Sequence, residues 1–191
     1  MATGNAQNVT ASKPRTTGCV YRAATTASAP TDATSSLGGA FTSLGYLSED
    51  GITNNNSPET AHVKAFGGDV VLNTLTGKKD TFKFKLIEST NTDVLSAVYG
   101  SGNVTGTLQT GIKVSAKSGD LEESMWVIDL ILKGGILKRT VIPCASISDM
   151  SEVVYNDTDA VGYEITLQAT PDLYGCTHYD YIKQSTPTPA S

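Results

Sequence analysis

The chain has 191 residues, a length that fits one domain with a single hydrophobic core. Its composition is 39% hydrophobic but only 7% aromatic, with 18 glycines, which predicts a folded protein rich in loops. Fourteen basic residues against nineteen acidic ones give a formal net charge of -5, which excludes the basic surface of a typical nucleic-acid binder.

The cysteines and the apolar runs indicate where the protein is made. Cys19, Cys144 and Cys176 are an odd number at wide spacing, so they match neither a disulfide framework nor a set of metal ligands. Residues 1–15 contain no apolar segment of the kind a secretory leader has, and no later apolar run approaches the roughly 20 residues of a membrane helix. We therefore expect synthesis in a reducing cytoplasm, without export and without membrane contact.

The first third of the chain is mostly polar. Residues 1–17 predict a flexible N-terminal arm, and residues 23–39 are small and polar enough that we expect them to be mobile. Short strands are expected at 18–22 and 41–47. Residues 48–60 lack an apolar period and exceed the usual length of a connection, which predicts a long loop ordered by a partner.

The clearest pattern follows that segment. Residues 69–75 and 80–87 are separated by the glycine-containing sequence 76–79, which predicts a β-hairpin. In its second strand three apolar residues alternate with three polar ones, so one face is expected to be buried. The apolar set is Phe82, Phe84 and Leu86, and the polar set is Thr81, Lys83 and Lys85.

One short helix is predicted at about 92–99. Asn91 or Thr92 suits its N-cap, Val94, Leu95 and Val98 share one face, and Gly100 suits its end. The apolar face of this helix is expected to pack on a sheet.

The second half of the chain is strand-rich. Residues 125–132 and 136–142 predict another hairpin, 161–169 alternate cleanly, and weaker strands are expected at 104–108 and 112–116. These elements predict a mainly β protein, a two-sheet β-sandwich or barrel with one flanking helix and long loops. Its single domain is expected to span 18–171, followed by a C-terminal extension, 172–191, with a disordered end.

No residue set predicts catalysis or a cofactor site. His62 and His178 lack a neighbouring nucleophile or carboxylate pair in the sequence, and both are interpreted as solvated surface residues. Cys176 and His178 would share a face of a strand, but no orienting partner accompanies them. Asp157 and Asp159 lack the glycine and glutamate that complete a calcium loop. We expect no enzyme activity, no cofactor and no metal.

Several runs together resemble the major tail tube proteins of siphophages, particularly those that infect actinobacteria. Their order and spacing are specific, and the resemblance covers about 37–171 but neither end of the chain. The runs are Gly45–Glu59, Ala65–Leu72, Lys79–Glu88, Thr92–Gly100, Trp126–Lys133 and Arg139–Ser146. We expect the chain to lack the additional immunoglobulin-like domain that some relatives carry.

The resemblance implies a virion structural protein. Six copies would join edge to edge into a ring, and rings would stack into a hollow tube that contacts the tape measure, tail terminator and distal tail proteins. Phage DNA would pass through the lumen without being bound specifically, because an acidic lumen repels it.

The same resemblance gives the polar segment 48–60 a role as an assembly loop that reaches the next subunit or ring. Ile52 is its expected apolar anchor, and Glu49 and Asp50 are expected to pair with Lys83 or Lys85 on the facing subunit. The residues assigned to the loop are Glu49, Asp50, Ile52, Asn54, Asn55 and Asn56.

The alternative is a surface or secreted β-sandwich module that binds carbohydrate or acts as an adhesin. Such modules usually present aromatic side chains on an exposed face. The single tryptophan, Trp126, lies in the most apolar predicted strand, which weighs against this alternative.

Overall fold

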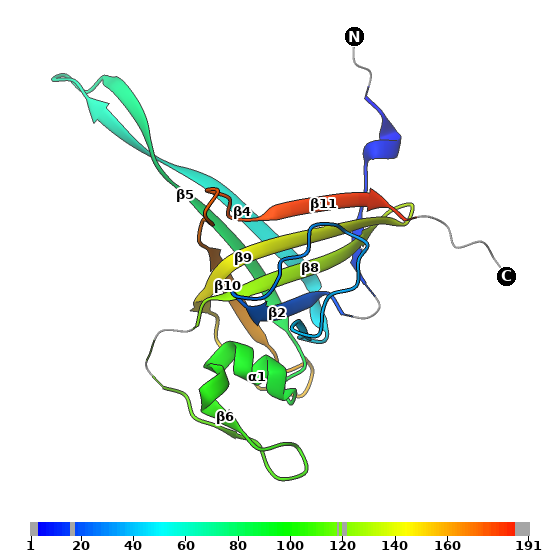
Figure 1. The fold of residues 1–191 in the computed structure, drawn as a ribbon. Coiled ribbons are helices and arrows are strands. Elements are labelled where there is room, and N and C mark those ends of the chain that lie inside the picture. Colours follow the sequence, from blue (N-terminus) through cyan, green and yellow to red (C-terminus); the bar gives the residue numbers. More distant parts are fainter. Residues whose placement is uncertain (1–3, 16–17, 118, 120–121, 186–191) are drawn as a thin grey trace.

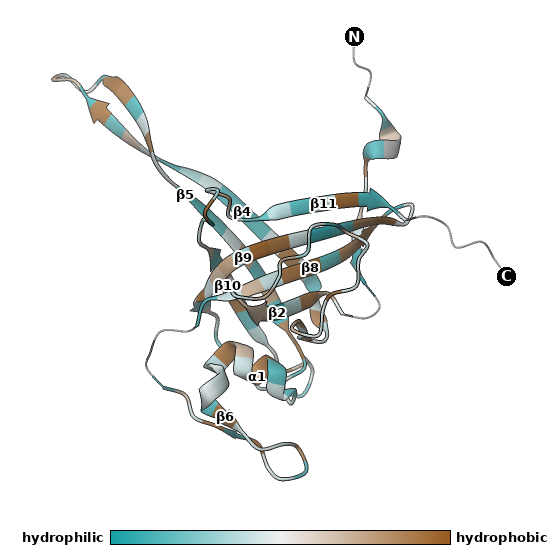
Figure 2. Ribbon diagram, viewed as in Figure 1, coloured by the Kyte–Doolittle hydropathy of each residue, from teal (hydrophilic) through white to brown (hydrophobic). Residues whose placement is uncertain are grey.

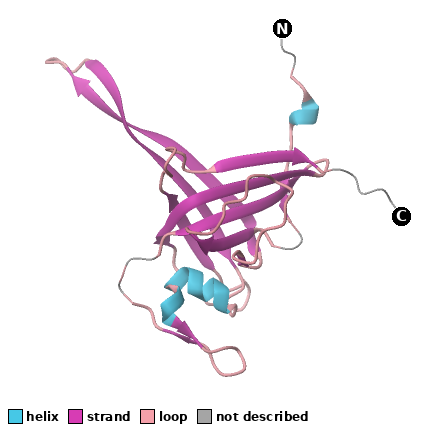
Figure 3. Cartoon of the chain, viewed as in Figure 1, coloured by secondary structure: helices cyan, strands magenta, loops and turns pink. Residues whose placement is uncertain are grey.

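A computed structural model describes residues 4–15, 18–117, 119 and 122–185. These residues form antiparallel strands and one α-helix (Figures 1 and 3). The predicted mainly β fold with a single short α-helix is confirmed, and within the described residues the strands do not close into a barrel. None of the described helices has the length and apolar character needed to cross a membrane.

Most strands belong to one nine-stranded sheet in the order β3-β2-β8-β9-β10-β5-β4, with β1 also paired to β8 and β11 also paired to β9. Its strands are β1 (Ser12–Pro14), β2 (Val20–Ala24), β3 (Thr42–Ser43), β4 (Leu47–Lys64), β5 (Val70–Leu86), β8 (Ser124–Leu132), β9 (Ile136–Met150), β10 (Tyr163–Ala169) and β11 (Tyr179–Gln184). A second, two-stranded sheet contains β6 (Val104–Thr105) and β7 (Lys113–Val114). Two short 3-10 turns, η1 (Ala6–Asn8) and η2 (Ser101–Asn103), complete the elements.

The long strand β9 divides the large sheet into two halves. On one edge it pairs with β8, and on the other its first part pairs with β11 and its last part with β10. In Figure 1, β4 and β5 cross β8 and β9 steeply. Phe84 of β5 and Trp126 of β8 meet edge to face at 6.2 Å, although their strands are not neighbours in the sheet. The core therefore lies between the two halves.

Helix α1 (Thr92–Tyr99) forms as predicted. The Asn91 side chain accepts a hydrogen bond from the backbone N of Asp93 at 2.9 Å, and Gly100 ends the helix with φ of +93°. Four residues of the helix are buried in the core cluster, namely Val94, Leu95, Ala97 and Val98.

The predicted loop at 48–60 is wrong, because this segment belongs to the long strand β4. The predicted turn at 76–79 is also wrong, since β5 continues through it. The two strands pair from Leu47 opposite Leu86 to Lys64 opposite Val70, and the turn lies at 65–69, where the Ala65 N donates to the Asp69 carbonyl at 2.7 Å. A strand exposed on both faces has no alternating apolar pattern, which is why the sequence indicated a loop.

Parts of both predicted extensions belong to the sheet. Strand β1 from the N-terminal arm pairs with β8, and β11 from the C-terminal extension pairs with β9. The predicted disordered end, 186–191, lies outside the described residues, as do 1–3 and 16–17 of the arm. The domain limits at 18 and 171 stay a prediction.

Candidate assembly surface

The hairpin β4–β5 projects far from the body of the protein (Figure 1). In β5, residues 80–82, 84 and 86 are buried, whereas 70–76 are all exposed, as are 58–64 of β4. A two-stranded ribbon is at best marginally stable alone, and none of the described strands pairs with the outer edge of β4. The outer half of the hairpin is therefore suited to contact with another molecule.

The outer half of the hairpin carries exposed apolar residues among polar ones (Figure 2). Val63 of β4 lies opposite Leu72 of β5, and Phe66 in the turn is fully exposed. The exposed large apolar residues of this hairpin tip are Val63, Phe66, Val70, Val71, Leu72 and Leu75. A contiguous exposed apolar patch on a soluble protein usually marks an interaction site.

Three of the predicted assembly residues lie at the base of the hairpin. Ile52 is half-buried and packs against the core cluster, so part of its apolar surface is used within its own chain. Glu49 and Asp50 are exposed where the β4–β5 register shifts between Leu47 and Ile52. The Ser48 hydroxyl donates to Asp50 Oδ2 at 2.8 Å, and both acidic residues remain exposed.

The three asparagines have different surroundings. Asn54 Nδ2 donates to Asp80 Oδ1 at 2.8 Å and to the Thr81 carbonyl at 3.1 Å, so Asn54 supports the hairpin itself. Asn55 Oδ1 accepts from the Ser57 hydroxyl at 2.5 Å, and both Asn55 and Asn56 are exposed. The structure does not test their predicted role in assembly.

The two predicted basic partners lie on β5. Lys83 Nζ is 2.8 Å from Glu164 Oε1 of β10, with the lysine side chain half exposed. Lys85 lies opposite Glu164 in the β5–β10 register. Among the described residues, neither lysine forms an ion pair with Glu49 or Asp50 of the same chain. Their pairing with another subunit stays a prediction.

A buried carboxylate holds the C-terminal extension to the hairpin, and the sequence did not reveal it. Asp80 is fully buried on β5, and its Oδ2 accepts from the Thr177 hydroxyl at 2.5 Å and contacts His178 Nδ1 at 2.6 Å. Burial raises the pKa of Asp80, but the hydrogen bonds from Thr177, His178 and Asn54 outweigh it and hold this pKa below its ordinary value. The interpretation of His178 as a solvated residue is wrong, because its ring also packs edge-on against Phe82.

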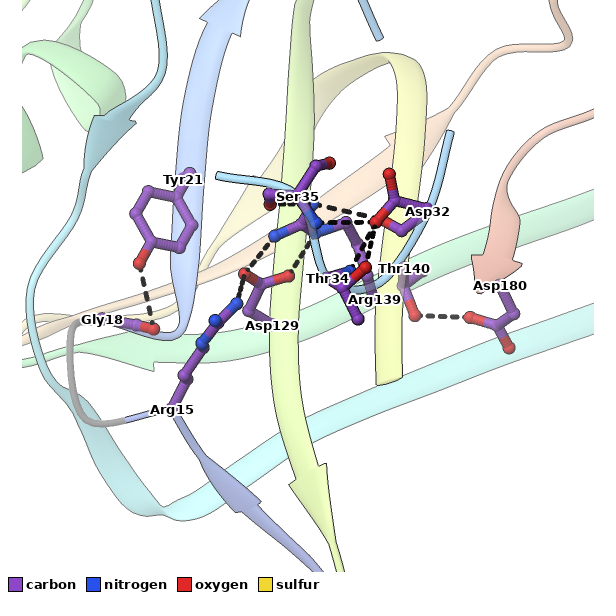
Figure 4. A network of polar contacts seen from close by, with 10 residues as sticks. All are labelled: Arg15, Gly18, Tyr21, Asp32, Thr34, Ser35, Asp129, Arg139, Thr140 and Asp180. Carbon is purple, nitrogen blue, oxygen red and sulfur yellow. Dashed lines mark hydrogen bonds and ion pairs between the residues drawn. The ribbon is translucent and has the colours of Figure 1, made fainter. Parts of the chain in front are cut away.

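A buried ion pair joins β8 and β9 in the other half of the sheet (Figure 4). Arg139 Nε and Nη2 donate to Asp129 Oδ1 and Oδ2 at 2.6 and 2.8 Å, and both side chains are almost completely buried. This hydrogen bonding raises the pKa of Arg139, and Arg15 reaches the same carboxylate at 3.2 Å. The pair thus joins β8, β9 and the end of the N-terminal arm.

Arg139 also holds part of the segment 23–39, which we expected to be mobile. Arg139 Nη1 donates to the carbonyls of Asp32 and Ser35 at 3.1 and 3.0 Å (Figure 4). Ala33, between them, is buried. The Asp32 carboxylate accepts from the backbone N of Ser35 and of Thr34, both at 2.6 Å, and these bonds lower its pKa. The expectation of mobility is wrong here because polar bonds, together with the burial of Ala33, hold this segment.

The described residues do not assemble a catalytic or metal site. Thr177 and His178 both bond to Asp80, so the imidazole does not activate the threonine hydroxyl as a base would activate a nucleophile. Burial raises the pKa of Cys19 to about 12, which keeps this thiol in its unreactive form. No cluster of three or more His, Cys, Asp or Glu side chains in this part of the chain is placed to hold a metal ion.

Comparison with known proteins agrees with a surface built for assembly. A protein-family model described as phage tail tube protein matches residues 1–190, which extends beyond the runs that suggested the resemblance to both ends of the chain. No match was found among curated proteins. The chain therefore belongs to the phage tail tube protein family, a family of structural proteins of the virion tail that assemble with themselves and with other tail proteins and are not enzymes.

Proposed function

We propose that this protein is the major tail tube subunit of a siphophage, and that six copies form a ring whose stacking builds the hollow tube for DNA delivery. The observation that carries this proposal is the projecting hairpin β4–β5, with an edge that pairs with no described strand and with exposed apolar residues at its tip. Both features favour association with a partner, and another copy of the chain supplies one. The tape measure, tail terminator and distal tail proteins are the proposed partners at the interior and ends of the tube.

Within this proposal the base of the hairpin belongs to the subunit contact. Glu49 and Asp50 present two exposed carboxylates to a neighbour, and Asn55 and Asn56 present exposed amides along the ribbon. Ile52 anchors the base of the hairpin to its own core. The alternative of a surface binding module is not supported by any exposed tryptophan, since Trp126 is only 2% exposed.

Replacing residues 60–76 by Asn-Gly is expected to abolish tubes without unfolding the subunit. Glu59 and Gly77 face each other across the hairpin, so a two-residue turn can join them, and every replaced residue is exposed. Circular dichroism should therefore remain that of the parent, while negative-stain imaging should show tubes only for the parent.

The matched control shortens another exposed turn, 107–110 between β6 and β7, by the same Asn-Gly replacement. This control should still form tubes. Normal tubes from the truncated hairpin would contradict a role of the hairpin in assembly. Failure of the parent chain to form rings or tubes under any condition would contradict the proposed function.

Duplex DNA is expected to bind the subunit and its tubes only negligibly. Each copy carries a formal charge of -5, and the Lys83 ammonium is already paired with Glu164. Phosphate binding depends on unpaired basic side chains that release counterions. A gel shift at low salt should show free DNA at all protein concentrations; a salt-sensitive complex would contradict passage of DNA without binding.

A further inference from the structure

A cavity of about 250 Å³ lies at the opposite end of β4 from the hairpin tip. It is bounded by β1 on one side and by the start of β4 on the other, with β8 between them. Its apolar lining residues are Pro14, Cys19, Leu47, Ile52 and Leu130. The cavity therefore offers an apolar socket of a size that suits one large side chain.

The charges around the socket differ between its two walls. Glu49 lines the β4 wall, with Asp50 next to it in sequence, and Lys13 lines the β1 wall. The hairpin turn has the reverse arrangement, since Lys64 ends β4 and Asp69 lies just before β5, on either side of Phe66. Opposite charges can therefore meet on both walls when Phe66 enters the socket.

The tip of a hairpin cannot reach the socket of its own chain. Ile52 and Phe66 are fourteen positions apart along an extended strand and its turn, which separates them by about 45 Å. A contact between tip and socket must therefore join two copies, and it is head to tail because different surfaces meet.

We propose that Phe66 of one subunit docks into the socket of a second copy of this chain, with Lys64 against Glu49 and Asp50, and Asp69 against Lys13. This inference rests on the proposed self-assembly into a tube and names the surface that receives the hairpin. Phe66 is the anchor because its side chain is fully exposed and aromatic, the kind of residue that dominates protein interfaces. The exposed carboxylates at the base of the hairpin thereby acquire a partner on the tip of the next one.

Disulfide trapping tests this contact. The variant Ala65→Cys with Ser48→Cys keeps Phe66 and places one thiol at the tip and one on the socket wall, in a background with Cys144→Ala and Cys176→Ser. Tubes oxidised mildly should give a ladder of dimers, trimers and higher species on a non-reducing gel, because a head-to-tail contact links every copy to two others. Each single cysteine variant, and Leu108→Cys with Ser48→Cys, should give no ladder, since Leu108 is an exposed apolar residue outside the hairpin.

Charge reversal gives an independent readout. Lys64→Glu should raise the critical concentration for polymerisation at least about tenfold, and adding Glu49→Lys in the same chain should restore most of that loss. Lys78→Glu, farther from the turn, should leave the critical concentration within about twofold. Tubes that form normally but give no ladder beyond the controls would overturn the docking site while leaving the proposed function intact. Absence of tubes from the parent chain would overturn both.

Discussion

Arg139→Met is expected to lower the free energy of unfolding of the unassembled subunit by about 3–5 kcal/mol. For a chain of this length that corresponds to a decrease of about 10 °C in Tm. Methionine fills much of the space of the arginine side chain, but it leaves the carboxylate of Asp129 buried with Arg15 as its remaining basic partner. It also frees the carbonyls of Asp32 and Ser35, so the segment that they hold loses its bonds to β9.

The neighbouring residue supplies the matched control. Lys138 also pairs with a carboxylate, Asp180, at 2.7 Å, but both side chains are partly exposed. Lys138→Met should therefore cost less than about 1 kcal/mol, because solvent screens such a pair. Thermal unfolding followed by circular dichroism compares the two variants, and equal Tm values would contradict the special role of Arg139.

A double variant distinguishes the loss of the contacts of Arg139 from the cost of leaving the Asp129 carboxylate buried without that partner. Adding Asp129→Leu to Arg139→Met removes the buried carboxylate and should restore much of the lost stability. If the double variant is no more stable than Arg139→Met alone, the loss comes from packing or from the freed segment and not from the unpaired Asp129.

The elements that sequence could predict are those whose pattern is local. The alternation of Phe82, Phe84 and Leu86 with polar residues predicted the buried part of β5 correctly, because half of that strand faces the core. The signals for the helix were equally local, since Asn91 caps its start, Gly100 ends it, and the residues between them have one apolar face. Such signals need no knowledge of the rest of the chain.

The candidate assembly surface was predicted in part. Sequence reasoning singled out the segment 48–60, yet it missed that this segment pairs with β5 far beyond the core. The exposed half of a ribbon gives no burial pattern, and a glycine at position 77 reads as a turn although it lies in the strand opposite Glu59. The pairing of β4 with β5 beyond the core depends on the tertiary context of both strands, and the composition of the segment does not reveal it.

The sequence could not predict the buried polar contacts, for another reason. Asp80 and His178 are 98 positions apart, and Arg139 and Asp32 are 107 apart. In each case one partner lies in a segment with little apolar character, so neither periodicity nor motif spacing connects the two. The sequence showed the charged residues but not which of them would be buried together.

Replacing the buried carboxylate by Asp80→Asn is expected to cost about 2 kcal/mol near neutral pH, since hydrogen bonds to a charged acceptor are lost. The native carboxylate accepts from Asn54, Thr177 and His178, and an amide cannot accept from all three. Urea unfolding at several pH values measures the difference between the native chain and the variant.

The difference in unfolding free energy between the native chain and Asp80→Asn should decrease as the pH is lowered. The pKa of Asp80 is lower in the folded chain than in the unfolded chain, so its stabilisation is fully present above about pH 4, the unfolded value. It is then lost as the pH falls through the folded value. The unfolding free energies of the native chain and of Asp80→Asn should therefore converge in acid. A gap that persists undiminished at pH 2.5 would contradict the assignment.

The stability lost with the contacts of Asp80 should appear first in the C-terminal extension. Thr177 and His178 connect this extension to the hairpin just before β11. Weakening this link lowers the cost of local opening without unfolding the core. His178→Gln should therefore accelerate hydrogen exchange of the amides at 179–184 more than that of β10. His62→Gln is the matched control, since the other histidine of the chain is exposed on the hairpin. Equal exchange at 179–184 in both histidine variants would show that pairing with β9 alone holds β11. Asp80 would then stabilise the hairpin but not the C-terminal extension.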